Sequence, residues 1–374
     1  MSLVTGEMSG TRPWHGLINA YRQFLPVSDA TPIITLNEGN TPLIPSASLS
    51  ERVDPKGRAD VRLKFDGANP TGSFKDRGMT MAISKAAEDG CKAVICASTG
   101  NTSASAAAYA TRAGMRCIVL IPKGNIALGK LSQAMLHGAD VFEVDGNFDG
   151  CLNMVRAMCD EYPVTLVNSV NPYRIQGQKT AAFELIDQLG GRAPDVQCMP
   201  VGNAGNITAY WLGYTEAHAD GRAPNRPIMC GFQARGANPI VRGEAVPNPE
   251  TIATAIRIGN PASWKQAEAA RDESGGLISD VSDDDILAAY KMIAERDGVF
   301  AEPASAASVA GLLQLCEKGW WSERLAGRSP ADPLRIVCIL TGAGLKDPER
   351  AIKCAEAPTQ VPADIHAIAG KLKL

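Results

Sequence analysis

Short apolar runs alternate with longer stretches of helical periodicity along most of this chain. Each run is only a few residues long, as buried strands are, and the segment after it carries apolar residues three and four positions apart, as helices do. Strands are predicted at residues 61–65, 93–97, 117–122, 140–144, 165–168, 196–201 and 336–340. Helices are predicted at residues 79–87, 103–113, 128–137, 148–162, 174–189, 207–219, 261–273, 283–296 and 303–318. This alternation predicts an α/β fold in which helices cover parallel sheets.

Length, composition and charge narrow the class of protein. A chain of 374 residues predicts two domains, and 45% hydrophobic with 21% charged residues is ordinary for a globular enzyme. The formal net charge of −3 lacks the basic excess that nucleic acids or anionic membranes attract. No apolar run approaches the ~20 residues that span a bilayer. Residues 1–13 lack the apolar core of a secretory signal, so a cytoplasmic location is expected.

Cysteine and histidine usage does not indicate a metal centre. None of the 10 cysteines stands in a Cys-x-x-Cys pair, and most lie in apolar segments, so reduced core thiols are expected. The 4 histidines are scattered far apart, which leaves no pattern for a metal cluster or for a histidine-based catalytic triad.

One lysine, Lys75, stands where a predicted strand turns into a predicted helix. Pro70, Gly72 and Ser73 punctuate the turn, which places Lys75 at or just inside the helix N-terminus. The helix dipole disfavours a second positive charge at that end, so the pKa of the amine should be lowered. The neutral amine is the form that condenses with an aldehyde. The alternative is a surface lysine after an ordinary strand-to-helix turn.

Four further loops begin where predicted strands end. One is built of small residues that let backbone N–H groups face an anion, and it consists of Gly202, Asn203, Ala204, Gly205 and Asn206. A bare turn would have the same composition. In the other loops, Asn101 and Thr102 are equally suited to cap a helix. Arg174 is equally explained as a solvated arginine, and Thr341 as part of a plain glycine-rich turn.

The segment 69–78 resembles the lysine motif of fold-type-II pyridoxal-phosphate enzymes, and among them that of the threonine synthases. The resemblance runs from about residue 14 to residue 348, nearly the whole chain. It implies an α/β fold like that of the tryptophan synthase β subunit, with two parallel-sheet αβα domains. It also implies that Lys75 forms a Schiff base with pyridoxal 5′-phosphate and that Phe74 packs beside the cofactor ring.

The same resemblance implies a role for each of the other loops. Loop 202–206 is similar to the cofactor-phosphate loop of threonine synthases, whereas dehydratases of this fold have a Ser/Gly-rich loop there. Asn101 matches the asparagine that binds the 3′ oxygen of the cofactor, and Thr341 matches the hydroxyl at its pyridine nitrogen. The residues implied to bind the substrate, the last three of them through its phosphate, are Thr102, Ser103, Asn168, Ser169 and Arg174.

These matches imply conversion of O-phospho-L-homoserine and water to L-threonine and phosphate. A planar, forked cation such as Arg174 suits a dianionic phosphate. A threonine or serine dehydratase stays open as an alternative, although Arg174, Thr102 and loop 202–206 disfavour it. A paralogue that uses phosphoserine also stays open. The intact Lys75 disfavours a catalytically silent regulator that only binds the cofactor.

Domain limits and partners are likewise implied by the resemblance. A smaller inserted αβ domain is expected at about residues 80–170, and residues 1–79 and 171–374 should form the larger, cofactor-binding domain. A homodimer is expected. Neither a metal ion, nor nucleic acid, nor a membrane is expected as a partner.

Overall fold

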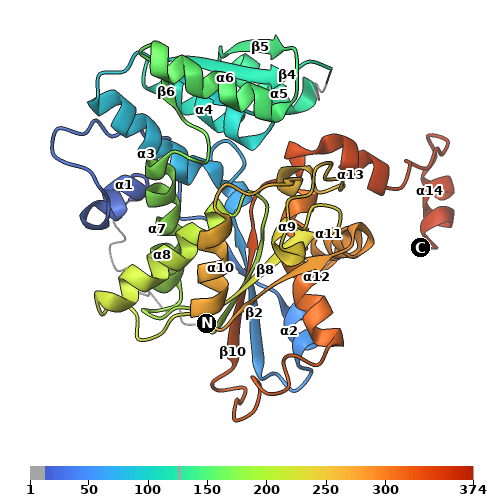
Figure 1. Ribbon diagram of the computed structural model, residues 1–374. Helices are drawn as coiled ribbons and strands as arrows, with labels where there is room; N and C mark the ends of the chain where they lie inside the picture. Colours follow the sequence, from blue (N-terminus) through green and yellow to red (C-terminus); the bar gives the residue numbers. More distant parts are fainter. Residues whose placement is uncertain (1–12, 125–127, 374) are drawn as a thin grey trace, which may run out of the picture.

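The computed structural model describes residues 13–124 and 128–373. In chain order the strands are β1 (Leu43–Pro45), β2 (Ala59–Phe65), β3 (Ala93–Ala97), β4 (Arg116–Pro122), β5 (Asp140–Val144), β6 (Thr165–Leu166), β7 (Val196–Pro200), β8 (Ile228–Ala234), β9 (Leu277–Val281) and β10 (Leu334–Leu340). The α-helices are α1 (Leu17–Ala20), α2 (Ala47–Val53), α3 (Lys75–Glu88), α4 (Asn101–Arg112), α5 (Leu128–Leu136), α6 (Phe148–Glu161), α7 (Pro172–Gln188), α8 (Gly205–Ala219), α9 (Pro239–Arg242), α10 (Trp264–Glu273), α11 (Asp283–Asp297), α12 (Pro303–Glu317), α13 (Pro348–Cys354) and α14 (Ile365–Leu372). Short 3-10 helices are η1 (Arg22–Phe24), η2 (Asp66–Ala68), η3 (Thr254–Ile256) and η4 (Gly344–Lys346). Strands and helices alternate, as the hydrophobic pattern predicted (Figure 1).

The strands form two separate sheets. The larger sheet has the order β1-β2-β10-β7-β8-β9, and the smaller has the order β5-β4-β3-β6. All neighbouring strands run parallel except the β1–β2 pair. The smaller sheet lies at the top of Figure 1 and the larger sheet below it. The predicted fold class, with two parallel sheets covered by helices, is confirmed.

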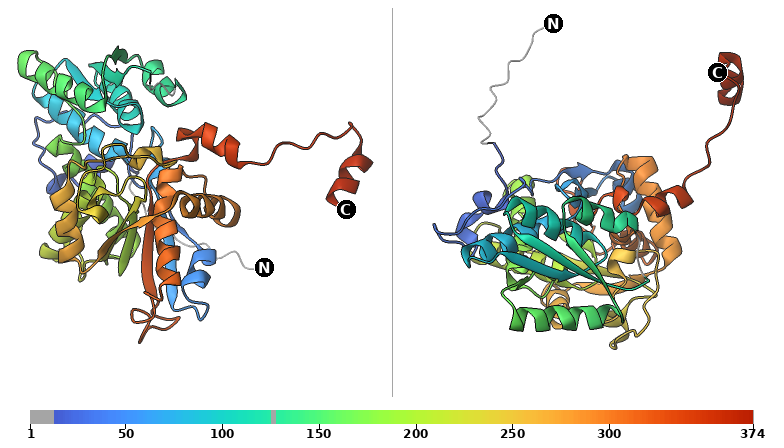
Figure 2. Two further views of the ribbon diagram at one scale, coloured as in Figure 1. Left: turned by 45° about the vertical axis from the view of Figure 1, so that its right-hand side comes forward. Right: turned by 90° about the horizontal axis from the view of Figure 1, so that it is seen from above.

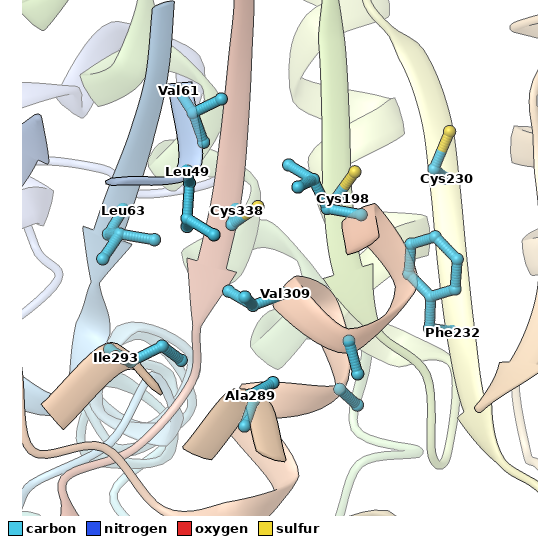
Figure 3. Close-up of a cluster of buried hydrophobic side chains, with 14 of the residues drawn as sticks. Leu49, Val61, Leu63, Cys198, Cys230, Phe232, Ala289, Ile293, Val309 and Cys338 are labelled. Atoms are coloured by element: carbon cyan, nitrogen blue, oxygen red, sulfur yellow. The ribbon is translucent and has the colours of Figure 1, made fainter. Parts of the chain in front are cut away.

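Helices cover both faces of the larger sheet. On one face α2, α11 and α12 bury their apolar sides against β2, β7, β8 and β10, and Figure 3 shows part of this cluster. On the other face the apolar sides of α7, α8 and α10 form a second cluster. The strand cysteines Cys338, Cys198 and Cys230 stand in register on three neighbouring strands within the first cluster. All ten cysteines are free, which agrees with the expectation of reduced thiols.

The elements differ from the sequence prediction in a few places. Strands β8 and β9 were not predicted, although both complete the edge of the larger sheet. The apolar run in β8 is fully compatible with a buried strand, but it lies in a stretch that carries no flanking helical pattern. Helix α3 begins at Lys75, as the preceding turn predicted, although its apolar periodicity starts only at Met79, because the first turn carries the charged residues Lys75, Asp76 and Arg77. Among the described residues, no helix combines the length and the apolar character that a membrane crossing needs.

Helices α3 and α7 cross in direct backbone contact. A Cβ atom placed on Gly177 would lie 2.0 Å from the carbonyl oxygen of Arg77 and 3.0 Å from Cα of Gly78. A Cβ atom on Gly78 would lie 2.9 Å from the carbonyl oxygen of Arg174. Glycine is therefore required on both helices for this approach. The crossing brings Arg174, near the start of α7, next to the first turn of α3.

A buried ion cluster fixes the same crossing. The guanidinium of Arg77 donates to Asp66 at 2.8 Å and to Glu184 at 2.8 Å, and all three side chains are buried. Lys64 from β2 also donates to Glu184. Thr41 adds its hydroxyl, which donates to Asp66 at 2.9 Å. The cluster joins β2, α3, α7 and the segment before β1, and a buried ion pair of this kind is costly to break on one side only.

The C-terminal segment extends away from the rest of the chain. Helix α13 follows the last strand, and residues 355–364 lead to α14 with every side chain exposed. Figure 2 shows α14 projecting from the body of the molecule. Its apolar residues Ile365, Ile368 and Leu372 are exposed.

Replacing Gly177 by alanine should separate α3 from α7. The added methyl group would collide with a backbone oxygen, which cannot change rotamer as a side chain can. Gly177→Ala should therefore lower the free energy of unfolding by about 1–3 kcal/mol or more. The control is Gly150→Ala in α6, where the added Cβ meets only Asn147 Oδ1 at 3.5 Å and stability should be unchanged within about 0.5 kcal/mol. Urea unfolding measures both changes. Equal stability of the two variants would show that the close crossing is not required.

Candidate functional site

The candidate residues gather where parallel strands end. Strands β3, β6, β7 and β10 stop just before Asn101, Asn168, Gly202 and Thr341, and Lys75 follows β2. Ligands of open parallel sheets bind at the carboxyl ends of the strands. Residues from distant parts of the sequence therefore meet in one place, between the two sheets.

Lys75 is the first residue of α3, and its turn is held against the loop after β10. The backbone N–H of Phe74 donates to the carbonyl of Thr341 at 2.9 Å, and that of Ala343 donates to the carbonyl of Gly72 at 2.9 Å. The Nζ atom of Lys75 lies 4.3 Å from the centre of the Phe74 ring. Lys75 is half-buried, so the alternative of an exposed surface lysine is wrong.

The pKa of the Lys75 amine is lowered to about 7. Burial is the largest cause, because it disfavours the charged amine, and the positive charge of Arg174 acts in the same direction. The carboxylate of Glu302 acts against both. The direction agrees with the sequence prediction, and the structure adds two causes that the sequence did not reveal, desolvation and a neighbouring cation. A substantial fraction of the amine is therefore neutral, and nucleophilic, near neutral pH.

Arg174 is completely buried in the first turn of α7. Its Nη1 atom donates to the carbonyl of Val167 at 3.3 Å, while Nε and Nη2 have no hydrogen-bond partner within the described chain. Burial lowers the pKa of Arg174 to about 10, so the guanidinium stays charged at neutral pH. The alternative of a solvated arginine is wrong. A buried guanidinium with free donors fits an anion that enters the site.

Asn168 and Ser169, the residues that precede α7, support this part of the site. The side-chain amide of Asn168 pairs with the backbone of Ala97 through two hydrogen bonds of 2.9 Å. It therefore joins the end of β3 to the segment after β6. The hydroxyl of Ser169 accepts a hydrogen bond from Nδ2 of Asn203, which links it to the loop after β7.

The loop after β7 is an open helix N-terminus. Ala204 has the left-handed φ of 64°, and α8 begins at Gly205. The amide nitrogen Nδ2 of Asn206 is buried and lacks a partner among the residues described. Gly202 lies against Ile256 so closely that a Cβ atom there would be 2.9 Å from its Cα. Free backbone N–H groups together with a buried donor fit a phosphate group.

The loop after β3 places three polar residues at the start of α4. Gly100, rather than Asn101 or Thr102, is the N-cap residue, so the alternative of a simple side-chain cap is wrong. The amide of Asn101 donates to both carboxylate oxygens of Glu302, at 3.2 and 3.1 Å. Ser103 donates to the carbonyl of Gly100 at 2.8 Å, and Thr102 is half-buried beside it.

Thr341 is buried at the end of β10, next to two groups that sequence reasoning did not single out. Its hydroxyl lies 3.1 Å from the hydroxyl of Ser305 and 3.4 Å from Oε1 of Glu302. Both partners come from the start of α12. The polar residues Glu302 and Ser305 on either side of Pro303, where a helix is predicted to begin, were the available signal.

Asp76, beside Lys75, is a second residue that sequence reasoning missed. Its buried carboxylate accepts hydrogen bonds from the hydroxyl of Thr71 at 2.6 Å and from that of Ser105 at 2.6 Å. Burial raises its pKa to about 6. The carboxylate ties the lysine turn to α4, which begins with Asn101.

The donor set fits pyridoxal 5′-phosphate. An aldehyde needs a neutral amine, which Lys75 supplies, and a phosphate needs unpaired donors, which the loop 202–206 and Asn206 provide. The aromatic ring of Phe74 and the hydroxyl of Thr341 border the same space. The fold and this cluster define a lysine-based enzyme that uses an aldehyde cofactor.

The family model described as pyridoxal-phosphate dependent enzyme matches residues 34–342. The chain belongs to this family. Several curated threonine synthases are similar to this chain in sequence. The threonine synthase of Synechocystis is 58% identical over 340 residues, which cover 91% of this chain and 85% of that protein. The threonine synthase of Mycobacterium tuberculosis is 56% identical over 364 residues, which cover 97% of both.

Solved structures show the same fold at lower identity. Maize serine racemase superimposes with a TM-score of 0.70 at 23% sequence identity. The superposition covers 84% of this chain and 91% of the racemase chain. The processed form of threonine deaminase isoform 2 from Solanum lycopersicum gives a TM-score of 0.70 at 20% identity and covers 95% and 93%. At these identities the likeness concerns the fold alone. The predicted fold-type-II class and the predicted family are confirmed.

Covalent capture of pyridoxal 5′-phosphate by the cofactor-free protein should depend on pH with a midpoint near 7. Because the pKa of Lys75 is lowered, most of the amine is neutral above pH 7. The capture rate should therefore increase with pH through this midpoint and then stay constant at higher pH. Stopped-flow absorbance measures the rate, and pyridoxal, which carries no phosphate, controls for titration of the cofactor itself. Borohydride reduction and peptide mapping should place the adduct on Lys75. A rate that still climbs at pH 10, or an adduct on another lysine, would contradict the assignment.

Proposed function

We infer that this chain catalyses the threonine synthase reaction, in which O-phospho-L-homoserine and water give L-threonine and phosphate with the help of pyridoxal 5′-phosphate. Curated threonine synthases at 48–58% identity over nearly the full length support this activity. The structural observation that supports it best is Arg174, a buried cation with unpaired donors in the same site as Lys75. A substrate with a phosphate group suits such a cation, whereas free threonine or serine does not need it.

Lys75 is proposed to hold the cofactor and to act as the main base. Bound pyridoxal 5′-phosphate supplies an electron sink for the substrate carbons. Once the substrate amine has replaced Lys75, the freed amine is placed to remove the Cα proton and then to move protons at Cβ and Cγ. Its lowered pKa suits this exchange, because an amine that titrates near 7 can both accept and release a proton at neutral pH.

The other side chains are proposed to bind and orient. Loop 202–206 holds the cofactor phosphate, Asn101 contacts the 3′ oxygen, and Thr341 contacts the ring nitrogen. Since a hydroxyl is neutral, Thr341 does not favour protonation of that nitrogen as a carboxylate would. Phe74 packs beside the ring.

Arg174, together with Asn168 and Ser169, is proposed to hold the phosphate of the substrate. Asn168 acts indirectly, because its side-chain amide is hydrogen-bonded to the backbone of Ala97 and thereby fixes the segment between β6 and α7. Thr102 and Ser103 are proposed to meet the substrate from the start of α4.

The division into domains, the oligomeric state and the cellular location are proposals too. Residues 80–170 are proposed as a smaller domain, with 1–79 and 171–374 as the larger one, and closure of the smaller domain would exclude water until it is needed. A homodimer is proposed from the resemblance, and a cytoplasmic location is proposed from the composition of residues 1–13. The small domain would contain the four-stranded sheet, whose strands all lie within its limits.

Turnover of matched substrates tests the proposed function. The purified protein, supplied with pyridoxal 5′-phosphate, should release threonine and phosphate in equal amounts from O-phospho-L-homoserine. O-phospho-L-serine, L-threonine and L-serine should react far more slowly. Preferential deamination of threonine or serine would identify a dehydratase instead, and preferential use of phosphoserine would identify the paralogue.

The role of Arg174 predicts a substrate-selective loss. Arg174→Gln removes the charge-assisted contact with a buried dianion, so kcat/KM for O-phospho-L-homoserine should fall by the equivalent of about 2–5 kcal/mol. Compared at a pH well above the capture midpoints of both proteins, binding of the cofactor and any slow deamination of threonine should change much less. The matched control is Arg156→Gln on the exposed side of α6, which should retain full activity. An equal loss on both substrate classes would mean that Arg174 supports the fold or the cofactor rather than the substrate phosphate.

A further inference from the structure

Glu302 lies at the centre of the site although the proposed mechanism gives it no role. The residue precedes α12 and is 5% exposed. Its two carboxylate oxygens share the donor Asn101 Nδ2, at 3.2 and 3.1 Å, and Oε1 also accepts from the Thr341 hydroxyl at 3.4 Å. It therefore joins the start of α4 to the end of β10, the two positions from which Asn101 and Thr341 are proposed to contact the cofactor.

The carboxylate is held firmly in that position. The backbone N–H of Glu302 donates to the carbonyl of Gly342 at 2.9 Å. A Cβ atom on Gly342 would lie 2.5 Å from Oε1 of Glu302, so the side chain rests directly on the backbone of the loop after Thr341. Only a residue without a side chain at position 342 leaves room for it.

A carboxylate in this place dictates which way its neighbours point. An ionised carboxylate only accepts hydrogen bonds, so the amide of Asn101 must turn its nitrogen toward Glu302. The second hydrogen of that nitrogen and the carbonyl oxygen of the amide are then left for other partners. The Thr341 hydroxyl is held in place beside the same carboxylate, with its oxygen 3.4 Å from Oε1 of Glu302 and 3.1 Å from the hydroxyl of Ser305.

The same carboxylate faces the cations of the site. Glu302 raises the pKa of Lys75 against the effects of burial and of Arg174 from α7. It acts in the same way on Lys346 from η4, where burial lowers the pKa. Asp76 also acts on Lys346. Glu302 is thus a nearby negative charge for both lysines.

We propose that Glu302 is a positioning residue that fixes the hydrogen-bond polarity of Asn101, and the place of the Thr341 hydroxyl, toward the cofactor. The inference rests on the cofactor contacts given under the proposed function. It does not depend on which substrate the enzyme uses, so it is tested with the protein and pyridoxal 5′-phosphate alone. Failure to turn over O-phospho-L-homoserine would overturn the proposed function and leave this inference standing.

Glu302→Gln is the first test. The amide is of nearly the same size but places an N–H group where Oε2 now accepts from Asn101, so the two amide nitrogens face each other unless Asn101 turns and reverses its hydrogen bond. The apparent dissociation constant for pyridoxal 5′-phosphate should rise about tenfold or more, and the visible band of the bound cofactor should shift. The midpoint of cofactor capture by the cofactor-free variant should fall below that of the wild type, because a negative charge near Lys75 is lost. The matched control, Glu216→Gln, removes a carboxylate that pairs with Lys179 elsewhere, and all three quantities should stay as in the wild type.

Two further variants separate position from charge. Glu302→Asp keeps the charge but is too short to reach both partners, so its capture midpoint should stay near that of the wild type while cofactor binding weakens. Asn101→Ala should likewise weaken cofactor binding with an unchanged midpoint, and it keeps the inference testable if a Glu302 variant does not fold. The inference is overturned if Glu302→Gln matches Glu216→Gln in affinity, spectrum and midpoint. It is also overturned if Asn101→Ala binds the cofactor as tightly as the wild type.

Discussion

The backbone contact between α3 and α7 is the constraint on which the site depends. Two glycines, Gly78 and Gly177, let the helices touch, and no side chain larger than hydrogen fits between them. Lys75 begins one of these helices and Arg174 lies in the first turn of the other. The contact therefore places two cations beside each other in a buried space. The buried ion cluster of Arg77, Asp66 and Glu184 fixes the same crossing.

The positive charges of Lys75 and Arg174 repel each other, and this repulsion favours the neutral amine that the proposed chemistry needs. Lys75 relieves part of it by losing its proton, which makes the amine a nucleophile near neutral pH. Arg174 cannot lose its proton and is left with donors that no described residue fills. An anionic ligand would neutralise the charge of Arg174 and accept hydrogen bonds from its unpaired donors. The site thereby suits a cofactor with an aldehyde and, as proposed, a substrate that carries a phosphate.

Local sequence signals revealed much of this arrangement, and the rest depended on pairing between distant segments. Alternation of apolar runs with helical periodicity predicted the parallel sheets, and the loops at the strand ends held Lys75, Asn101, Arg174 and Thr341. The burial of Arg174 was not visible locally, because an arginine after a turn is ordinarily solvated. The bonds of Glu302 to Asn101 and of Asp76 to Ser105 join parts of the chain that only the tertiary fold brings together. The glycine pair at the helix crossing was invisible for the same reason.

The pKa of Lys75 in the cofactor-free Arg174→Gln variant tests this account most directly. If the two cations are held together as described, removal of the guanidinium charge relieves the repulsion, and the midpoint of aldehyde capture should move upward from about 7. Burial still acts in the variant, so the midpoint should remain below that of an ordinary lysine. A midpoint identical to that of the wild type would contradict the account, since Lys75 and Arg174 would then not share one electrostatic environment.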